Sequence, residues 1–114
     1  MGRDGFVGAF EELVLLAVIR GRGTGYGMTV RREIEERTGR DVTIGAVYAT
    51  LDRLEKKGWV TSAVGEPDAD RGGRARRYFR VLPEGVDALQ TLRSARDGLW
   101  EGVDLDDVVS GGAS

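Results

Sequence analysis

The clearest helical pattern on the chain runs over residues 43–57. Its apolar positions recur at spacings of three, four and three residues, on one face of a helix with 3.6 residues per turn: Ile44, Val47, Leu51 and Leu54. Thr43 has the hydroxyl to cap the start, and Gly58 can end the helix in a left-handed conformation. The opposite face carries small or charged side chains: Gly45, Ala49, Asp52 and Lys56, with Ala46 and Arg53 at one edge and Tyr48 on the flank. A face so slim could be the solvated side of an ordinary core helix, or it could lie close against a large anion such as DNA.

Two further helices are predicted before this one. Residues 10–20 are apolar nearly all round, so we expect this helix to be largely buried. Glycines at positions 21, 23, 25 and 27 end it. Residues 26–37 form the second helix, which Thr38-Gly39 closes, and its apolar positions are Met28, Val30 and Ile34.

After the third helix the pattern becomes that of a β-hairpin. Residues 59–64 and 76–82 are rich in β-branched and aromatic side chains, and residues 65–74 between them are rich in turn formers. Pro83 suits the first position of a fourth helix. Residues 103–114 are acidic and end in small residues, so we expect a frayed tail.

The order helix, helix, helix, hairpin, helix is that of a winged helix-turn-helix, a mainly α fold with a small β-hairpin (α+β). We expect residues 1–82 to form the DNA-binding domain, 83–102 a dimerisation helix and 103–114 a disordered tail. In such a fold the third helix enters the major groove. The hairpin, called the wing, reaches an adjacent minor groove or row of phosphates.

Composition excludes several classes of protein. A chain of 114 residues forms one domain. It has no cysteine and no histidine, which excludes zinc fingers, thiol nucleophiles and histidine acid–base catalysis, so we expect no cofactor and no metal. The longest apolar run, residues 13–19, is too short to span a bilayer, and no secretory signal is visible. We therefore expect a cytoplasmic protein without a membrane partner.

Charge is distributed unevenly along the chain. The net charge is −2, but residues 97–114 carry five acids and no base, and the rest holds 17 bases against 14 acids. Residues 71–80 contain five arginines and no acid. This basic stretch lies on the predicted wing, where each positioned arginine would release counterions from DNA.

Several residues are candidates for DNA contact, and most of them have a second possible role. The Tyr48 hydroxyl could bond a phosphate, or Tyr48 could only pack. Arg53 and Lys56 point outward in the helical pattern. Asp52 could pair with Lys56 or accept a hydrogen bond from cytosine. Arg77 could pair with a nearby acid. Since the small side chains of the third helix offer few hydrogen-bonding groups, we expect much of the specificity to come from DNA shape. The full candidate set is Tyr26, Thr43, Gly45, Tyr48, Ala49, Arg53, Lys56, Arg71, Arg74 and Arg76.

Five segments in order resemble one known family, over roughly residues 10–100. They are Leu13 to Ile19, Gly25-Tyr26-Gly27, Ile34 to Gly39, Gly45 to Gly58, and Gly73 to Gly85. Together they are similar to the PadR transcriptional regulators, and the short C terminus resembles that of the smaller subfamily. Two departures are Ala49, where the family commonly has proline, and Leu82-Pro83, where threonine often precedes the helix. The resemblance implies a homodimeric repressor that binds double-stranded DNA at a palindromic operator.

The fourth helix also carries a pattern suited to dimerisation. Ala88, Leu92, Ala95 and Leu99 repeat at four, three and four residues, with Leu89 and Trp100 beside them. We expect this seam to meet the first and fourth helices of a second copy, with Leu13 and Leu16 on the first helix. The alternative is that the fourth helix folds back on its own first helix.

Trp100 supports a more specific expectation. The resemblance implies a pore between subunits in which an aromatic side chain of the last helix stacks on a flat aromatic effector, here Trp100 with Leu99 and Phe10. The alternative is that Trp100 only packs in the interface.

Two other classes of function are alternatives to DNA binding. An enzyme is disfavoured because the glycines of residues 21–27 fail the dinucleotide-binding spacing and no Gly-Lys-Ser/Thr follows for a phosphate-binding loop. A winged helix used only for protein contact would need an apolar or acidic outer face on the third helix, whereas this one carries Arg53 and Lys56.

Overall fold

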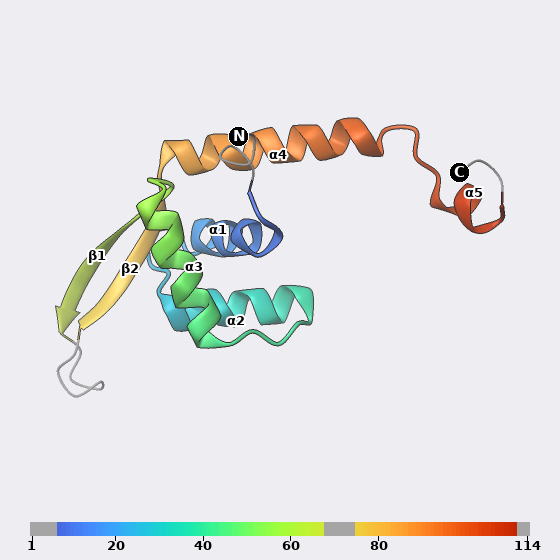
Figure 1. The fold of residues 1–114 in the computed structure, drawn as a ribbon. Coiled ribbons are helices and arrows are strands. Elements are labelled where there is room, and N and C mark those ends of the chain that lie inside the picture. Colours follow the sequence, from blue (N-terminus) through green and yellow to red (C-terminus); the bar gives the residue numbers. More distant parts are fainter. Residues whose placement is uncertain (1–6, 68–74, 112–114) are drawn as a thin grey trace.

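The structure is a computed structural model that describes residues 7–67 and 75–111. Three helices pack together, a two-stranded wing stands beside them and a long helix lies above them (Figure 1). The elements are α1 (Ala9–Arg20), α2 (Gly27–Thr38), α3 (Ile44–Lys56), β1 (Val60–Pro67), β2 (Ala75–Val81), α4 (Pro83–Trp100) and α5 (Leu105–Val109). This order confirms the predicted winged helix-turn-helix.

The ends of α2 and α3 follow from the residues at their boundaries. The Thr43 hydroxyl accepts a hydrogen bond from the backbone N–H of Ala46 at 3.1 Å, which caps α3. Gly39 after α2 and Gly58 after α3 have φ of 73° and 81°, a left-handed conformation that suits glycine. The predicted start and stop of the third helix are therefore confirmed.

The hydrophobic core lies between the three helices and the base of the wing. Its fully buried members come from five elements: Val14, Leu15 and Val18 in α1, Val30 in α2, Val47, Leu51 and Leu54 in α3, Val60 in β1 and Phe79 in β2. The two strands pair antiparallel from Val60 opposite Val81 to Val64 opposite Arg77. The N–H of Phe79 also donates to the carbonyl of Gly25 at 2.9 Å, so the loop between α1 and α2 is bonded to the second strand of the wing.

The C-terminal part of the chain extends away from this body. The first half of α4 packs on it, with Ala88 buried and Leu89 and Leu92 against the core. Every described residue from Arg93 to Gly111 is exposed, and Figure 1 shows the end of α4 and all of α5 projecting beyond α1 and α2.

Two expectations from the sequence need correction. The segment predicted to be a frayed tail contains α5, whose start is capped by the Asp104 carboxylate, which accepts from the N–H of Asp106 at 3.0 Å. The first helix was expected to be largely buried, but Leu16 and Ile19 are 43% and 42% exposed. Across the described ranges, no helix combines the length and the apolar character that crossing a bilayer requires.

Candidate nucleic-acid interface

The outer face of α3 is open and consists mainly of small side chains. Gly45, Ala46, Ala49, Asp52 and Lys56 are all exposed, while Val47, Leu51 and Leu54 are buried beneath them. A methyl group built at Gly45 would meet nothing within 4 Å. The backbone of α3 can therefore approach another surface closely over the residues that were predicted to face DNA.

The turn that precedes α3 is held by two side chains of α2. The N–H of Val42 donates to the Glu35 carboxylate at 2.9 Å, and the Val42 carbonyl accepts from Arg31 Nε at 2.9 Å. Both backbone groups of one turn residue are thus bonded to the preceding helix. This fixes the start of α3 relative to α2, which is the geometry that a helix-turn-helix needs.

Tyr48 lies against the start of α2. A methyl group built at Gly27 would come within 2.3 Å of Tyr48 Cζ and 2.4 Å of its hydroxyl oxygen. Gly27 is buried, whereas Tyr48 remains 39% exposed. The absence of a side chain at Gly27 leaves the space that the tyrosine occupies, and it leaves the ring edge open to a ligand.

Arg53 is placed differently from the sequence expectation. It was predicted to point outward, but its Nε lies 3.5 Å from the Glu11 carboxylate in α1, and Nη2 donates to Thr50 Oγ1 at 3.2 Å. Lys57 also binds Glu11, at 3.0 Å. The pattern located Arg53 at the edge of the outer face, but its long side chain reaches back to the buried carboxylate of Glu11 in α1. Because Arg53 is still 55% exposed, one edge of its guanidinium remains open to solvent.

Glu11 itself was missed by the sequence reading. It is only 8% exposed and accepts a hydrogen bond from the Gly8 N–H at 3.0 Å. Burial raises the pKa of this carboxyl, but the bonds from Gly8, Lys57 and Arg53 more than offset it, so the pKa lies below its ordinary value. The spacing of three between Gly8 and Glu11 is that of a capping box and could have signalled part of this role.

A second set of contacts joins α3 to the wing. Arg77 in β2 binds the Glu55 carboxylate, lies 3.5 Å from the Asp52 carboxylate and donates from Nε to Ser62 Oγ at 3.1 Å. The Ser62 hydroxyl in turn donates to Glu55 at 2.8 Å. The expectation that Arg77 pairs with an acid is confirmed. Asp52, expected to pair with Lys56 if not with DNA, is paired with Arg77 instead, because the wing brings a cation to it from outside its own helix.

Lys56 is the remaining predicted cation on α3. It is exposed and forms no ion pair with residues 7–67 or 75–111. Of the cations of α3 itself, it is therefore the one most available for a phosphate.

Aromatic rings join the second strand of the wing to the start of α2. The Arg76 guanidinium lies 4.5 Å from the centre of the Tyr26 ring, and Tyr26 meets Tyr78 edge to face at 5.9 Å. Tyr26 therefore positions Arg76 at the junction of wing and helices. The other two predicted wing arginines, Arg71 and Arg74, lie outside the described residues.

The residues predicted for dimerisation and effector binding fall into separate groups. Ala88 is buried in the core of its own chain, with Leu89, Leu92 and Leu13 partly buried against it, so half of the seam folds back on its own body. Leu16, Ala95, Leu99 and Trp100 are exposed. Trp100 lines a groove between α1 and α4, whereas Phe10 lines a different groove beside Val42, so one chain does not bring the proposed effector residues together.

Comparisons with solved structures agree with this architecture. A PadR family transcription regulator from Clostridium difficile is 21% identical, with 82% of this chain and 93% of that chain covered and a TM-score of 0.67. A PadR family regulator from Eggerthella lenta is 23% identical, with 79% and 76% covered and a TM-score of 0.64. A Streptococcus transcriptional regulator is 26% identical, with 81% and 85% covered and a TM-score of 0.64. No curated protein matches the chain at a significant level.

The family comparison covers most of the molecule. The model of the PadR-like transcriptional regulator family matches residues 15–91, which include α2, α3, both strands of the wing and the first half of α4. These are the elements that build the open α3 face and its junction with the wing. The chain therefore belongs to the PadR-like family of transcriptional regulators, which bind DNA and are not enzymes.

Proposed function

We propose that this regulator is a homodimeric, ligand-responsive repressor that binds a palindromic operator. The observation that carries the proposal is the exposed face of α3 next to the base of the wing. Gly45 and Ala49 allow a close approach, Lys56 offers a free ammonium, and Arg76 lies on the Tyr26 ring at the edge of the same surface.

Two kinds of contact follow from this arrangement. Lys56, Tyr48 and the open edge of Arg53 would bind phosphates and fix the orientation of the protein. The small residues of α3 would enter the major groove, where they offer few hydrogen bonds to bases. Specificity would then rest largely on the shape of the DNA and on the distance between half-sites.

A second copy is supported by the apolar surface that one chain leaves uncovered. Leu99 and Trp100 at the end of α4 are 80% and 58% exposed, and Leu16 and Ile19 on α1 are exposed as well. A groove of about 480 Å³ runs between α1 and α4 and is lined by Leu16, Ile19, Val86, Leu89 and Trp100. The α4 helix of a second copy, placed in this groove, would cover these side chains and bring two α3 helices to one face of a DNA duplex.

The test of DNA binding is footprinting on the DNA upstream of the coding sequence, followed by titrations at two salt concentrations. We expect a protected palindrome and an affinity that falls steeply with salt. A chain that binds none of these fragments even at low salt would favour a winged helix used for protein contact. Transcription from the footprinted promoter in vitro distinguishes a repressor from an activator.

The effector is tested through the tryptophans. Trp59 is buried and gives a constant background, whereas Trp100 is exposed. We expect planar aromatic compounds to quench fluorescence at micromolar concentration and to weaken DNA binding. Equal binding of these compounds by Trp100→Ala would show that Trp100 only packs in the interface.

A further inference from the structure

Leu16 and Ile19 form an exposed ridge on α1 that separates two grooves. The groove between α1 and α4 is the one described above. The other, of about 410 Å³, lies between α1 and α2 and is lined by Leu13, Leu16, Ile19 and Ile34 among others. Because Leu16 and Ile19 line both grooves, whatever occupies one groove borders directly on the other.

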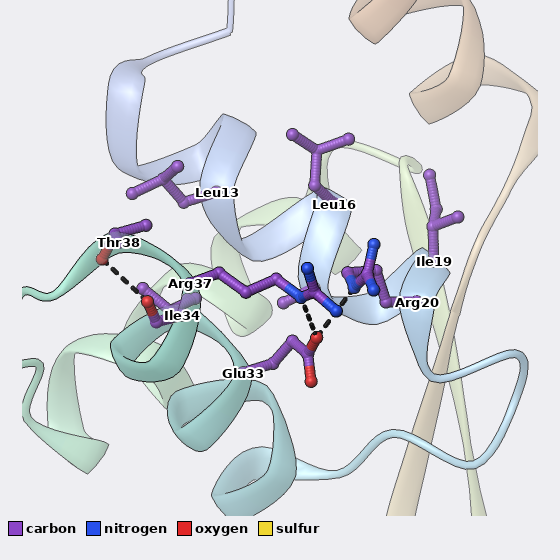
Figure 2. A pocket seen from close by; sticks show the side chains of 9 residues that line it. Leu13, Leu16, Ile19, Arg20, Glu33, Ile34, Arg37 and Thr38 are labelled. Carbon is purple, nitrogen blue, oxygen red and sulfur yellow. Dashed lines mark hydrogen bonds and ion pairs between the residues drawn. The ribbon is translucent and has the colours of Figure 1, made fainter.

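The rim of the α1–α2 groove is cationic. Figure 2 shows Arg20 from α1 and Arg37 from α2 converging on one oxygen of Glu33, at 2.7 and 2.6 Å. Two guanidinium groups share one carboxylate, so this rim keeps an excess positive charge. Both arginine side chains remain about half exposed, at 48% and 56%. The groove therefore suits an apolar occupant that also carries acidic groups.

The C-terminal segment of this chain has that chemistry. Its apolar side chains are all open to solvent: Val103 at 48%, Leu105 at 57%, Val108 at 56% and Val109 at 86%. Between and beside them stand Glu101, Asp104, Asp106 and Asp107, and no basic residue lies from Asp97 to Gly111. A helix as short as α5, with its apolar face in water, is marginal by itself and needs a surface to cover it.

We propose that α5 of one copy docks in the α1–α2 groove of a second copy. The inference rests on the proposed homodimer, in which α4 of the second copy lies in the α1–α4 groove. From there the chain only has to cross the Leu16–Ile19 ridge, one helix wide, or about 10 Å. The five peptide links between Trp100 and Leu105 can span up to about 17 Å.

The occupant comes from the other copy because of the direction of α4. This helix runs straight past the end of α1, and α5 lies beyond the ends of both helices that form the groove (Figure 1). In the docked arrangement Leu105 and Val108 cover the apolar wall, and Asp106 and Asp107 meet Arg20 and Arg37.

Cross-linking tests this arrangement directly, because the chain has no cysteine of its own. Val108→Cys on α5 is combined with Thr38→Cys, which lines the α1–α2 groove. A short bismaleimide should convert this variant into a covalent dimer. Val108→Cys combined with Lys56→Cys, on the outer face of α3, is the matched control and should give no more dimer than Val108→Cys alone. A cross-link that forms only within one chain, or equal dimer in both variants, would overturn the proposal.

The mass of the native chain in solution separates this inference from the proposed function. A monomer by light scattering means that the homodimer itself is wrong. A dimer whose Val108→Cys/Thr38→Cys variant does not cross-link means that only the α5 docking is wrong.

As a second measurement, Val108→Asp/Val109→Asp should raise the dissociation constant of the dimer about tenfold. The control Ser110→Asp, which lies beyond the apolar positions of α5, should leave this constant unchanged. An unchanged constant in the first variant would mean that α5 does not help to hold the dimer together and would overturn the docking.

Discussion

Gly27→Ala tests whether Tyr48 is held in place for DNA contact. The added methyl would lie 2.3 Å from Tyr48 Cζ, closer by roughly 1.4 Å than carbon atoms approach without repulsion. The ring must therefore move. Because Tyr48 is 39% exposed, it can swing outward, and we expect the free energy of unfolding to fall by no more than about 1 kcal/mol.

The expected loss is in DNA binding. A hydrogen bond to a charged group contributes about 1.5 kcal/mol or more, and about 1.4 kcal/mol corresponds to a tenfold change in affinity. If the Tyr48 hydroxyl binds a phosphate, Gly27→Ala and Tyr48→Phe should each weaken operator binding about tenfold. Fluorescence anisotropy of labelled operator DNA at constant salt measures this, with thermal unfolding followed in parallel.

A double-mutant cycle decides whether the effect passes through the tyrosine. In the Tyr48→Ala background, Gly27→Ala has no ring to displace and should change the affinity no further. Gly98→Ala is the matched control, because its methyl meets nothing within 4 Å and the position lies on α4. Equal losses for Gly27→Ala with and without the ring would refute the reasoning.

Three further predictions concern the contacts of α3. Burial raises the pKa of Glu11, but hydrogen bonds from Gly8 and Lys57 lower it more, so the pKa in the folded state lies below the ordinary value of 4.5. The ionised Glu11 carboxylate should therefore stabilise the fold above pH 4.5, and this stabilisation should be lost as the pH falls through the folded pKa. Glu11→Gln should therefore lose stability at pH 7 and show a flatter pH dependence in urea unfolding, and a parallel decrease at all pH values would contradict this. Gly45→Leu should keep the melting temperature, because the site is open, yet abolish measurable operator binding by blocking close approach; binding as tight as that of the native chain would show that α3 does not enter the groove. Arg77→Met, which frees the wing from Glu55 and Asp52, should weaken DNA binding severalfold with an unchanged salt slope, whereas a slope reduced by about one would mean that Arg77 itself binds a phosphate.

Local signals in the sequence were enough to predict the order of the elements. The boundaries of α3 follow from a capping hydroxyl at Thr43 and a left-handed Gly58, both of which act on their immediate neighbours. The apolar spacing also identified Val47, Leu51 and Leu54 as buried. These features depend on contacts within one or two helical turns, where a linear pattern carries the information.

Contacts between distant elements were not accessible in the same way. Arg53 and Asp52 both lie on the outer half of α3 by their spacing, but the first reaches Glu11 in α1 and the second faces Arg77 in the wing. The predicted dimer surface on α1 included Leu16 but not Ile19, because an all-apolar helix does not reveal how far the side that its own chain leaves open extends. The short α5 was hidden by its acidic composition, which is also typical of disordered segments.

The two hydrogen bonds that hold Val42 to α2 have a consequence for how such a regulator can respond to a signal. Glu35 and Arg31 of α2 hold both backbone groups of this residue, so the reading helix cannot tilt without breaking two hydrogen bonds at once. The pair of helices α2 and α3 then behaves as one rigid block. In the proposed homodimer, a signal that releases the operator would have to change the spacing or the relative rotation of two such blocks, and the bending would take place in the C-terminal arm that connects them.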